Sequence, residues 1–234
     1  MSLIRTLCLL LIFSLSGFFL GCGQSQTSHN NKIPSQTNEE MVFTQNSELV
    51  SNPPAETLRN NKFQPFYVYS DKESRKNHLV PSGFMPDGKC LPLNEAWVEN
   101  CHSAKTCIRI DYDVDCSKRS QHWAGIYWLN PANNWGQRKG GFSLKEATKL
   151  TFWARGEHGG EQIQEFTVGG IMGNYPDSDT ALIGPVILTP EWKEYTIDLR
   201  GKDLSYISGG FAWTSSVDVN PETCVFYLDD IRYE

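Results

Sequence analysis

The segment HWAGIYWLNPANNWG, residues 122–136, gathers side chains suited to holding an uncharged, hydroxyl-rich ligand. It contains three of the seven tryptophans, one tyrosine and three asparagines. A flat ring can cover the C–H face of a sugar, and an amide can both donate to and accept from its hydroxyl groups. The same rings would equally fill the core of a β-sandwich, because large aromatic side chains are mostly buried. Both interpretations stay open at the level of the sequence.

Two surfaces are candidates for such a ligand. The first is a sheet face, whose members are Trp128, Trp153, Arg155 and Trp213. The second is a rim of loops, whose members are Asn133, Asn134, Trp135, Tyr175, Asp177, Ser178 and Asp179. We favour the rim for Trp135, because this residue follows a Pro-Ala-Asn-Asn turn and loops commonly carry binding residues. The alternative is that YPDSD, residues 175–179, is an Asx-type turn whose carboxylates bond their own backbone.

Short strands separated by Gly, Pro, Asn and Asp turns position these residues. We predict strands at 63–70, 106–114, 122–130, 148–156, 165–171, 184–189, 192–199, 207–215 and 224–233. No run of useful length has a helical period, and 143–150 supplies one turn at most. This spacing predicts an all-β fold, a two-sheet β-sandwich of the jelly-roll type. Within 122–130, alternation places Trp123 and Tyr127 on one face and Trp128 on the other, so one face must be core.

The N-terminus indicates export. Arg5 precedes an apolar run that ends at Leu20, which is too short for a typical membrane span, so residues 1–21 predict a signal peptide. The sequence Phe-Leu-Gly-Cys at 19–22 resembles a bacterial lipobox, which implies lipidation, palmitate included, at Cys22. Gly23 follows in place of a retention aspartate, so we expect the outer membrane in a host with two membranes. The alternative is an ordinary signal peptide with a chance cysteine.

A tether and one folded domain follow the signal. Residues 22–60 hold the lipidated cysteine and a polar stretch too poor in apolar residues to fold. Residues 61–234 suffice for one domain with a real core. The net charge is −6 and no basic patch carries interleaved aromatic residues, which argues against nucleic acid. We expect a monomer in the cell envelope, with its domain outside the cytoplasm.

Five cysteines remain once Cys8 and Cys22 are set aside. They are Cys90, Cys101, Cys107, Cys116 and Cys224. In an exported domain, an odd number predicts two disulfides and one free thiol, with the connectivity open. No CxxC pair appears, which argues against a zinc site of cysteines.

Several short sequence segments occur in a characteristic order. They are WAGIYWLNPANNWG, GGFSLKEATKLTFWARG, YPDSD, LTPEWKEYTIDLRGKDLS, GGFAW and FYLDDIRYE. Over residues 63–234 the chain resembles the galactose-binding-like jelly-roll domains of bacterial surface lipoproteins and of non-catalytic carbohydrate-binding modules. The resemblance implies the fold more strongly than the ligand, since that fold also carries protein binders and a minority of enzymes.

The resemblance also implies a structural calcium ion between the last strand and the first loops. The matching residues are Asp229 and, second, Asp230, with Asp71 as a further ligand and Glu73 or Asp87 as others. Calcium takes several oxygen ligands. The alternative is that Asp229 and Asp230 bond backbone amides at a strand edge.

Signs of catalysis are weak. Neither Asp177 with Asp179 nor Glu157 with Glu161 forms the signature of a glycosidase, and no GxSxG or HExxH motif occurs. A lyase set could be chosen from Tyr127, His122 and Arg155, although nothing in the sequence selects it. We therefore predict a lipid-anchored module that binds an oligo- or polysaccharide without cleaving it. The alternatives are a surface lipoprotein with a structural or protein-binding role and, less favoured, a polysaccharide lyase or hydrolase.

Overall fold

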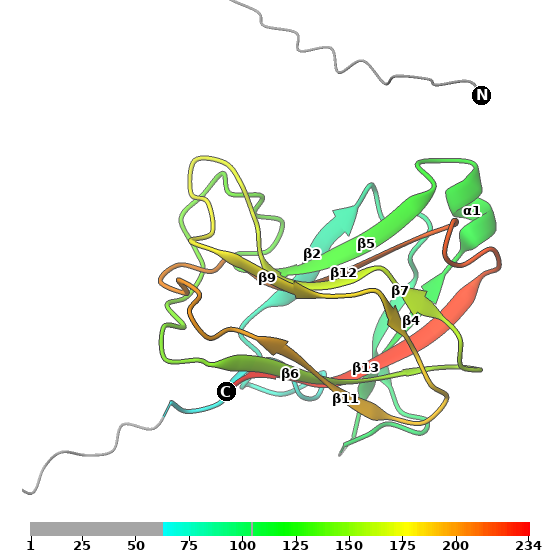
Figure 1. Ribbon diagram of the computed structural model, residues 1–234, viewed down its shortest axis with the longest axis horizontal. Helices are drawn as coiled ribbons and strands as arrows, with labels where there is room; N and C mark the ends of the chain where they lie inside the picture. Colours follow the sequence, from blue (N-terminus) through cyan, green and yellow to red (C-terminus); the bar gives the residue numbers. More distant parts are fainter. Residues whose placement is uncertain (1–62, 104) are drawn as a thin grey trace, which may run out of the picture. The chain divides into compact units, whose positions relative to one another are not determined.

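The computed structural model describes residues 63–103 and 105–234. The predicted signal peptide, the lipidation site at Cys22 and the tether lie outside the described residues. Two antiparallel sheets build the domain and stack as two layers, as Figure 1 shows.

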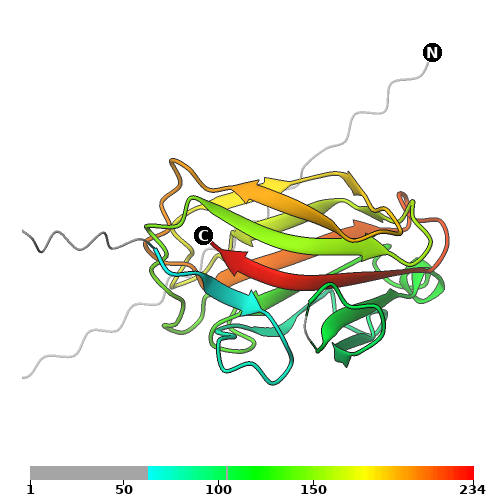
Figure 2. The ribbon, with the colours of Figure 1, turned by 90° about the horizontal axis from the view of Figure 1, so that it is seen from below.

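One layer, here called the β13 sheet, has the strand order β11-β6-β13-β4-β3, and β1 also pairs with β13. Its strands are β1 (Phe66–Tyr69), β3 (Leu93–Trp97), β4 (Cys107–Tyr112), β6 (Lys149–Gly156), β11 (Lys193–Asp198) and β13 (Cys224–Tyr233). Figure 2 shows β1 running along the C-terminal strand β13. The first and last described strands are therefore neighbours.

The other layer, here called the β12 sheet, has the order β2-β5-β12-β8-β9. Its strands are β2 (Val80–Met85), β5 (Trp123–Leu129), β8 (Glu165–Gly169), β9 (Thr180–Ile183) and β12 (Gly209–Ser216). The short strands β7 (Gln162–Ile163) and β10 (Val186–Ile187) form a separate pair. From β4 to β8, and again from β11 to β13, successive long strands alternate between the two sheets, which confirms the predicted jelly-roll β-sandwich.

The core lies between the two sheets and follows the predicted alternation. In β6, Leu150, Phe152 and Ala154 are fully buried and face the β12 sheet. From that sheet, Trp128 and Trp213 point back into the same core, each at 0% exposure. Burying side chains of this size supplies most of the favourable free energy of folding.

Two edge strands escaped prediction because their sequences hide the strand pattern. β2 contains Pro81 and Gly83, which usually mark turns, and it is tolerated because it lies at the edge of its sheet. β3, with the sequence LNEAW, is also an edge strand and is half exposed. An edge strand lacks the two-sided burial that makes a strand visible in the sequence. The short strands β7 and β9 were likewise not predicted as separate elements.

The single described helix, α1 (Val114–Lys118), was also missed. Its N-cap Asp113 accepts a hydrogen bond from the Cys116 N–H at 2.8 Å, so the start signal is local. With five residues it is too short to show a helical period. The segment 143–150, where one turn was expected, holds a hydrogen-bonded turn from Leu144 to Ala147 and then enters β6. Among the described residues, no helix has the length and apolar character needed to cross a membrane.

The cysteines confirm the prediction of two disulfides and one free thiol in the domain. Cys90 pairs with Cys116, Cys101 pairs with Cys107, and Cys224 is free and buried. Burial raises the pKa of the Cys224 thiol to about 12, with a smaller contribution from the Glu161 carboxylate. This thiol therefore stays protonated and unreactive at neutral pH.

Candidate functional site

The rings expected on one sheet face do not share it. Trp128 and Trp213 are fully buried in the core and belong to the β12 sheet, whereas Trp153 and Arg155 lie on the outer side of the β13 sheet. The prediction that Trp128 and Trp213 contact a ligand is therefore wrong. Alternation alone could not show which of the two faces of residues 123–129 is the core, and Trp128 lies on the buried one.

Trp135 lies on the loop after β5 and is 38% exposed. Its indole packs edge-to-face on Tyr127, with ring centroids 5.9 Å apart and planes at 80°. The Tyr127 hydroxyl in turn donates to the Gly169 carbonyl at 3.1 Å. The exposed ring is therefore held by a second ring that is itself anchored to β8.

Asn134 fixes the loop that carries Trp135. Its amide Nδ2 donates to the Arg138 carbonyl at 2.8 Å, and its Oδ1 accepts from the N–H groups of Gln137 and Arg138. The side chain is only 1% exposed, so its amide serves the loop and not a ligand, contrary to the prediction. Asn133, in contrast, is exposed, and its backbone N–H donates to Ser82 Oγ at 2.9 Å.

The carboxylates of the second loop, 171–179, also serve the fold. Asp177 accepts from the backbone N–H groups of Ile171, Ser208 and Gly209 and from the Ser208 hydroxyl. Asp179 accepts from the Thr180 and Asp203 N–H groups and pairs with Lys202. Both carboxylates are therefore structural, but most of their partners lie in other segments, at 171, 202–203 and 208–209, and not within YPDSD as an Asx-type turn would require.

Tyr175 connects the two loops of the rim. Its N–H donates to the Gly136 carbonyl at 2.9 Å, directly after Trp135, and its side chain is half-buried. Met172, on the same loop, is 75% exposed. Ser178 is also exposed, but its hydroxyl donates to the Asp203 and Tyr206 carbonyls. Of the predicted rim, the structure thus leaves Asn133, Trp135 and Tyr175 as surface residues whose side chains do not hold the loops together, and Asn134, Asp177, Ser178 and Asp179 bond loop backbone.

A row of residues, here called the floor, extends from Trp135 across the outer side of the β12 sheet, and its members Gly83 and Ala212 are buried. The strand registers place one row of outward-facing residues side by side: Gly83, Tyr127, Ala212, Thr167 and Leu182. A Cβ atom at position 83 would lie 3.1 Å from Trp135 Cζ2, so the indole rests against the bare backbone of β2. At the far end of the row, Leu182 is 51% exposed. We call this row together with Trp135 the Trp135 platform.

The outer face of the β13 sheet carries a second group of rings, most of which sequence reasoning missed. Its members are Trp97, Arg109, Tyr227, Arg155 and Trp192, here called the arginine ladder. The Arg155 Cζ atom lies 3.8 Å from the Tyr227 ring centroid and 5.6 Å from that of Trp192. On the other side, Arg109 Cζ lies 4.8 Å from the Trp97 ring centroid, and Arg109 donates to the Tyr227 hydroxyl at 3.2 Å.

In the arginine ladder the cations cover the rings. Arg155 is only 6% exposed, so the prediction that it contacts a ligand is wrong. Trp153, beside the ladder, is covered by the His102 ring at a centroid distance of 3.7 Å. Only the alternation in β6 pointed to this face, because Trp97 lies in an unrecognised strand and His102 lies in a loop.

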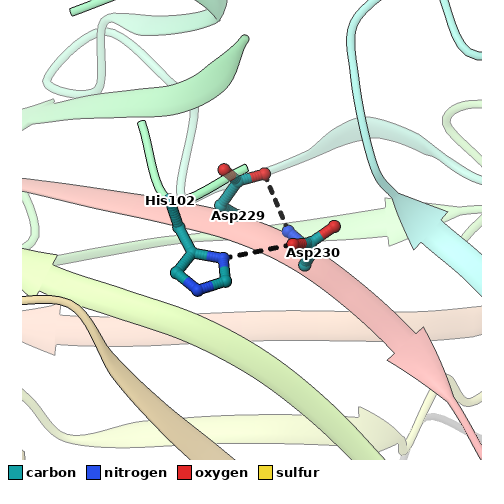
Figure 3. A group of neighbouring side chains, drawn as sticks. All are labelled: His102, Asp229 and Asp230. Carbon is teal, nitrogen blue, oxygen red and sulfur yellow. Dashed lines mark hydrogen bonds and ion pairs between the residues drawn. The ribbon is translucent and has the colours of Figure 1, made fainter. Parts of the chain in front are cut away.

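A third group lies where loop 101–107 meets β13. A β-bulge between Asp229 and Arg232, with Asp230 at φ 47°, places two consecutive carboxylates on the same side of the strand. His102 Nδ1 is 3.2 Å from Asp230 Oδ2. Figure 3 shows the imidazole pointing toward this carboxylate, with Asp229 beside it. Ligand atoms of His102, Asp229 and Asp230 all lie within 4.8 Å of one another. We call these three residues the His102 cluster.

Asp229 is buried within this cluster. Its Oδ2 accepts from the Ser103 N–H at 2.9 Å and from the Ser103 hydroxyl, and its Oδ1 accepts from the Asp230 N–H. The pKa of Asp229 is raised to about 6, chiefly by burial and to a smaller extent by the Asp230 carboxylate, against the lowering effect of the Ser103 and Asp230 donors. Asp71, predicted as a third acidic ligand, accepts instead from the N–H groups of Lys105 and Thr106 and lies outside the cluster.

The three residues named as a possible lyase set, Tyr127, His122 and Arg155, do not lie together in the structure. Tyr127 lies on the outer face of the β12 sheet, whereas Arg155 is buried in the arginine ladder on the other sheet. His122 precedes β5 with a φ of 66° and is separated from Tyr127 by the four strand residues 123–126. Of the two carboxylates near the hairpin, Glu157 accepts from the Tyr227 hydroxyl, and Glu161 accepts from the His158 N–H through Oε1 while its Oε2 is buried without a hydrogen-bond partner among the described residues.

No family model and no curated protein matches the chain. Solved structures of similar fold include the family 30 carbohydrate-binding module of a cellulosomal cellulase of Clostridium thermocellum, at 15% identity and TM-score 0.47, covering 74% of this chain and 98% of that one. A family 11 carbohydrate-binding module from the same organism matches at 13% identity and TM-score 0.45, with 70% and 91% covered. The CBM22-1 xylan-binding domain of Paenibacillus barcinonensis Xyn10C matches at 13% identity and TM-score 0.39, with 66% and 88% covered. At these identities and TM-scores no ligand or function is transferred, and the residues themselves must carry the functional argument.

Proposed function

We propose that this domain binds carbohydrate, without cleaving it, at the Trp135 platform. The observation that carries the proposal is the state of Trp135, which is 38% exposed yet held in place by Tyr127 and by the Asn134-fixed loop. A ring exposed in a fixed orientation pays little ordering entropy when a ligand stacks on it. This combination is what a sugar-stacking residue requires.

The surroundings of Trp135 fit an elongated, neutral ligand. The floor between Trp135 and Leu182 consists of small or flat residues, among which Tyr127 and Thr167 are half-buried and Leu182 is 51% exposed. The Thr167 hydroxyl belongs to this floor, and Asn133 and Tyr175 lie on the loops that carry and contact Trp135, so hydroxyl and amide groups that match sugar hydroxyls accompany the exposed ring. Because one exposed ring would supply most of the contact, we expect dissociation constants between about 1 μM and 1 mM, or about −8 to −4 kcal/mol.

A glycan array followed by tryptophan fluorescence titration of the hits tests the proposal. We expect Trp135→Ala to weaken binding at least about tenfold, about 1.4 kcal/mol, because the stacking surface is removed. Trp97→Ala is the matched control, since Trp97 is a partly exposed tryptophan on the other sheet. Absence of glycan binding at millimolar concentration, or equal loss in both variants, would overturn the proposal.

The non-catalytic part of the proposal rests on the carboxylates. Asp177 and Asp179 are both engaged in hydrogen bonds that hold the loop beside the platform. Hydrolysis of a glycosidic bond requires two carboxyl groups facing the bond. Incubation with polysaccharide pools should therefore yield neither new reducing ends nor unsaturated products, and the appearance of either would contradict this part.

We further propose that Cys22 carries lipid and anchors the domain to the cell envelope. The apolar run and the Phe-Leu-Gly-Cys sequence support this proposal, although they lie outside the described residues. Metabolic labelling with a palmitate analogue in a bacterial host should mark the wild-type chain and not Cys22→Ala. Cys8→Ala, within the predicted signal, is the matched control and should leave labelling unchanged.

A further inference from the structure

We propose that the His102 cluster binds one divalent transition-metal ion of the zinc class, in place of the calcium that the resemblance implies. The proposal concerns a site on the β13 sheet, away from the Trp135 platform, so it does not depend on the proposed function. It rests on the donor types, their separation and the contacts that hold them (Figure 3).

The separation of the donors suits a single small ion. His102 Nδ1 and Asp230 Oδ2 are 3.2 Å apart, and the nearest Asp229 oxygen completes a group within 4.8 Å. Two ligands that bond zinc at 2.0–2.2 Å with a tetrahedral angle are themselves about 3.3 Å apart. The His102–Asp230 pair is therefore already close to the spacing of two zinc ligands.

Neighbouring groups hold each donor in place. The His102 ring stacks on Trp153 at 3.7 Å with 14° between planes, and the Cys101–Cys107 disulfide closes the loop that carries it. The Ser103 N–H and hydroxyl fix the Asp229 carboxylate. Outer contacts of this kind orient metal ligands and raise affinity. Access is from solvent, because the His102 and Asp230 side chains are 28% and 16% exposed while Asp229 is buried.

The donor set departs from what calcium needs. Calcium takes six to eight oxygen ligands, whereas the cluster offers two carboxylates and one imidazole nitrogen. Asp71 is engaged with N–H donors, Asp229 Oδ2 already accepts from the Ser103 N–H and hydroxyl, and Asp229 Oδ1 accepts from the Asp230 N–H. An imidazole together with carboxylates is a ligand set of zinc and its transition-metal neighbours.

A bound ion would join loop 101–107 to the last strand of the β13 sheet. Both carboxylates come from β13 and the imidazole comes from the loop, so the ion would add a second closure beside the disulfide. Stabilisation by a ligand that binds only the folded state grows with its concentration over its dissociation constant. Metal binding should therefore be visible in thermal unfolding as well as by direct titration.

Calorimetric titration of the full chain with Zn²⁺, Co²⁺ and Ca²⁺, each alone, tests the proposal. We expect about one equivalent of Zn²⁺ or Co²⁺ to bind, with the visible absorption of Co²⁺ reporting the coordination. His102→Gln retains a planar polar group and should weaken Zn²⁺ binding at least tenfold, as should Asp230→Asn. His78→Gln is the matched control, because it alters a histidine stacked on Phe66 on another surface.

Three results would overturn the proposal. They are the absence of Zn²⁺ and Co²⁺ binding at 100-fold molar excess, equal binding by His102→Gln and wild type, and tighter binding of Ca²⁺ than of Zn²⁺. Unfolding curves of the variants without metal separate a loss of ligation from a loss of fold. Glycan binding is measured in parallel, and its failure would count against the Trp135 platform and not against the metal site.

Discussion

The outer faces of both sheets carry tryptophans, but the two faces differ in how far other side chains cover these rings. On the β13 sheet, Arg155 and Arg109 cover the faces of Tyr227 and Trp97, and His102 covers Trp153. On the β12 sheet, Trp135 has an edge-to-face neighbour and retains 38% exposure. An aromatic and arginine-rich face is therefore not by itself a ligand site. What distinguishes the two faces is whether the protein itself already occupies the ring surfaces.

The largest expected effect comes from neither face but from the core between them. Trp128→Ala should lower the free energy of unfolding by about 3–5 kcal/mol, because it leaves a large cavity beside Phe211. Denaturant unfolding monitored by circular dichroism measures this change. If the loss is below about 1 kcal/mol, Trp128 is not the core residue described here and the division of residues 123–129 into a core and an outer face is wrong.

The arginine ladder should contribute to stability without contributing to ligand binding. Arg155→Ala should reduce the free energy of unfolding by about 2 kcal/mol, since a desolvated cation–π contact is lost. Glycan affinity of this variant should equal that of wild type. Arg155→Lys is the control that keeps the charge. A change in glycan affinity in either variant would mean that the outer face of the β13 sheet also takes part in glycan binding.

For Tyr127 we expect the opposite pattern, a small effect on stability together with an effect on glycan affinity. Tyr127→Phe keeps the ring that supports Trp135 and removes the hydrogen bond to the Gly169 carbonyl, at a cost of about 1 kcal/mol in stability. We expect a loss of glycan affinity of about two- to fivefold, because the support of Trp135 becomes looser. Tyr67→Phe, on β1 of the other sheet, serves as the control. A glycan affinity equal to wild type would mean that the hydroxyl does not help to hold the platform.

The smallest expected effect is that of pH on the same residue. Burial raises the pKa of Tyr127 to about 12, so its hydroxyl keeps its proton and its donor role across pH 6–9. Its contribution to stability is complete below pH 10, the unfolded value, and is lost as the pH rises through 12. Glycan affinity should accordingly be flat from pH 6 to 9. A melting-temperature profile should fall less steeply above pH 10 in Tyr127→Phe than in wild type.

The sequence predicted the regular interior of this fold and missed its edges. β5, β6 and β13 are flanked by strands on both sides, so period-two alternation identifies them directly. β2 and β3 have a neighbour on one side only, and Pro81 and Gly83 read as turn residues. The prediction that Trp128 lies on a ligand-binding sheet face was wrong, because side chains alternate with the same period on the inner and the outer face of a strand. The period alone does not show which face is the core.

The candidate sites were predicted in part for a related reason. Trp135 follows a recognisable turn and could be named from local sequence, whereas Asp229 and Asp230 were named through the resemblance, as ligands of calcium. His102 and Asp230 are 128 residues apart in the sequence, so no local sequence pattern predicts their contact. The bulge that places both carboxylates on one side is likewise a property of strand pairing and is not visible in the letters YLDDI.

Gly83 links the two halves of the Trp135 platform in a way that bears on how this surface changes over time. Its backbone lies against the indole at a buried position, and a Cβ atom there would lie 2.8 Å from Leu129 Cδ1 and 2.9 Å from Tyr127 Cβ. A mutational scan would therefore score position 83 as intolerant, as if it belonged to the core. A smaller residue at position 135 would not relieve this, because the closer contacts are those with Leu129 and Tyr127, so position 83 should remain glycine whichever residue occupies position 135.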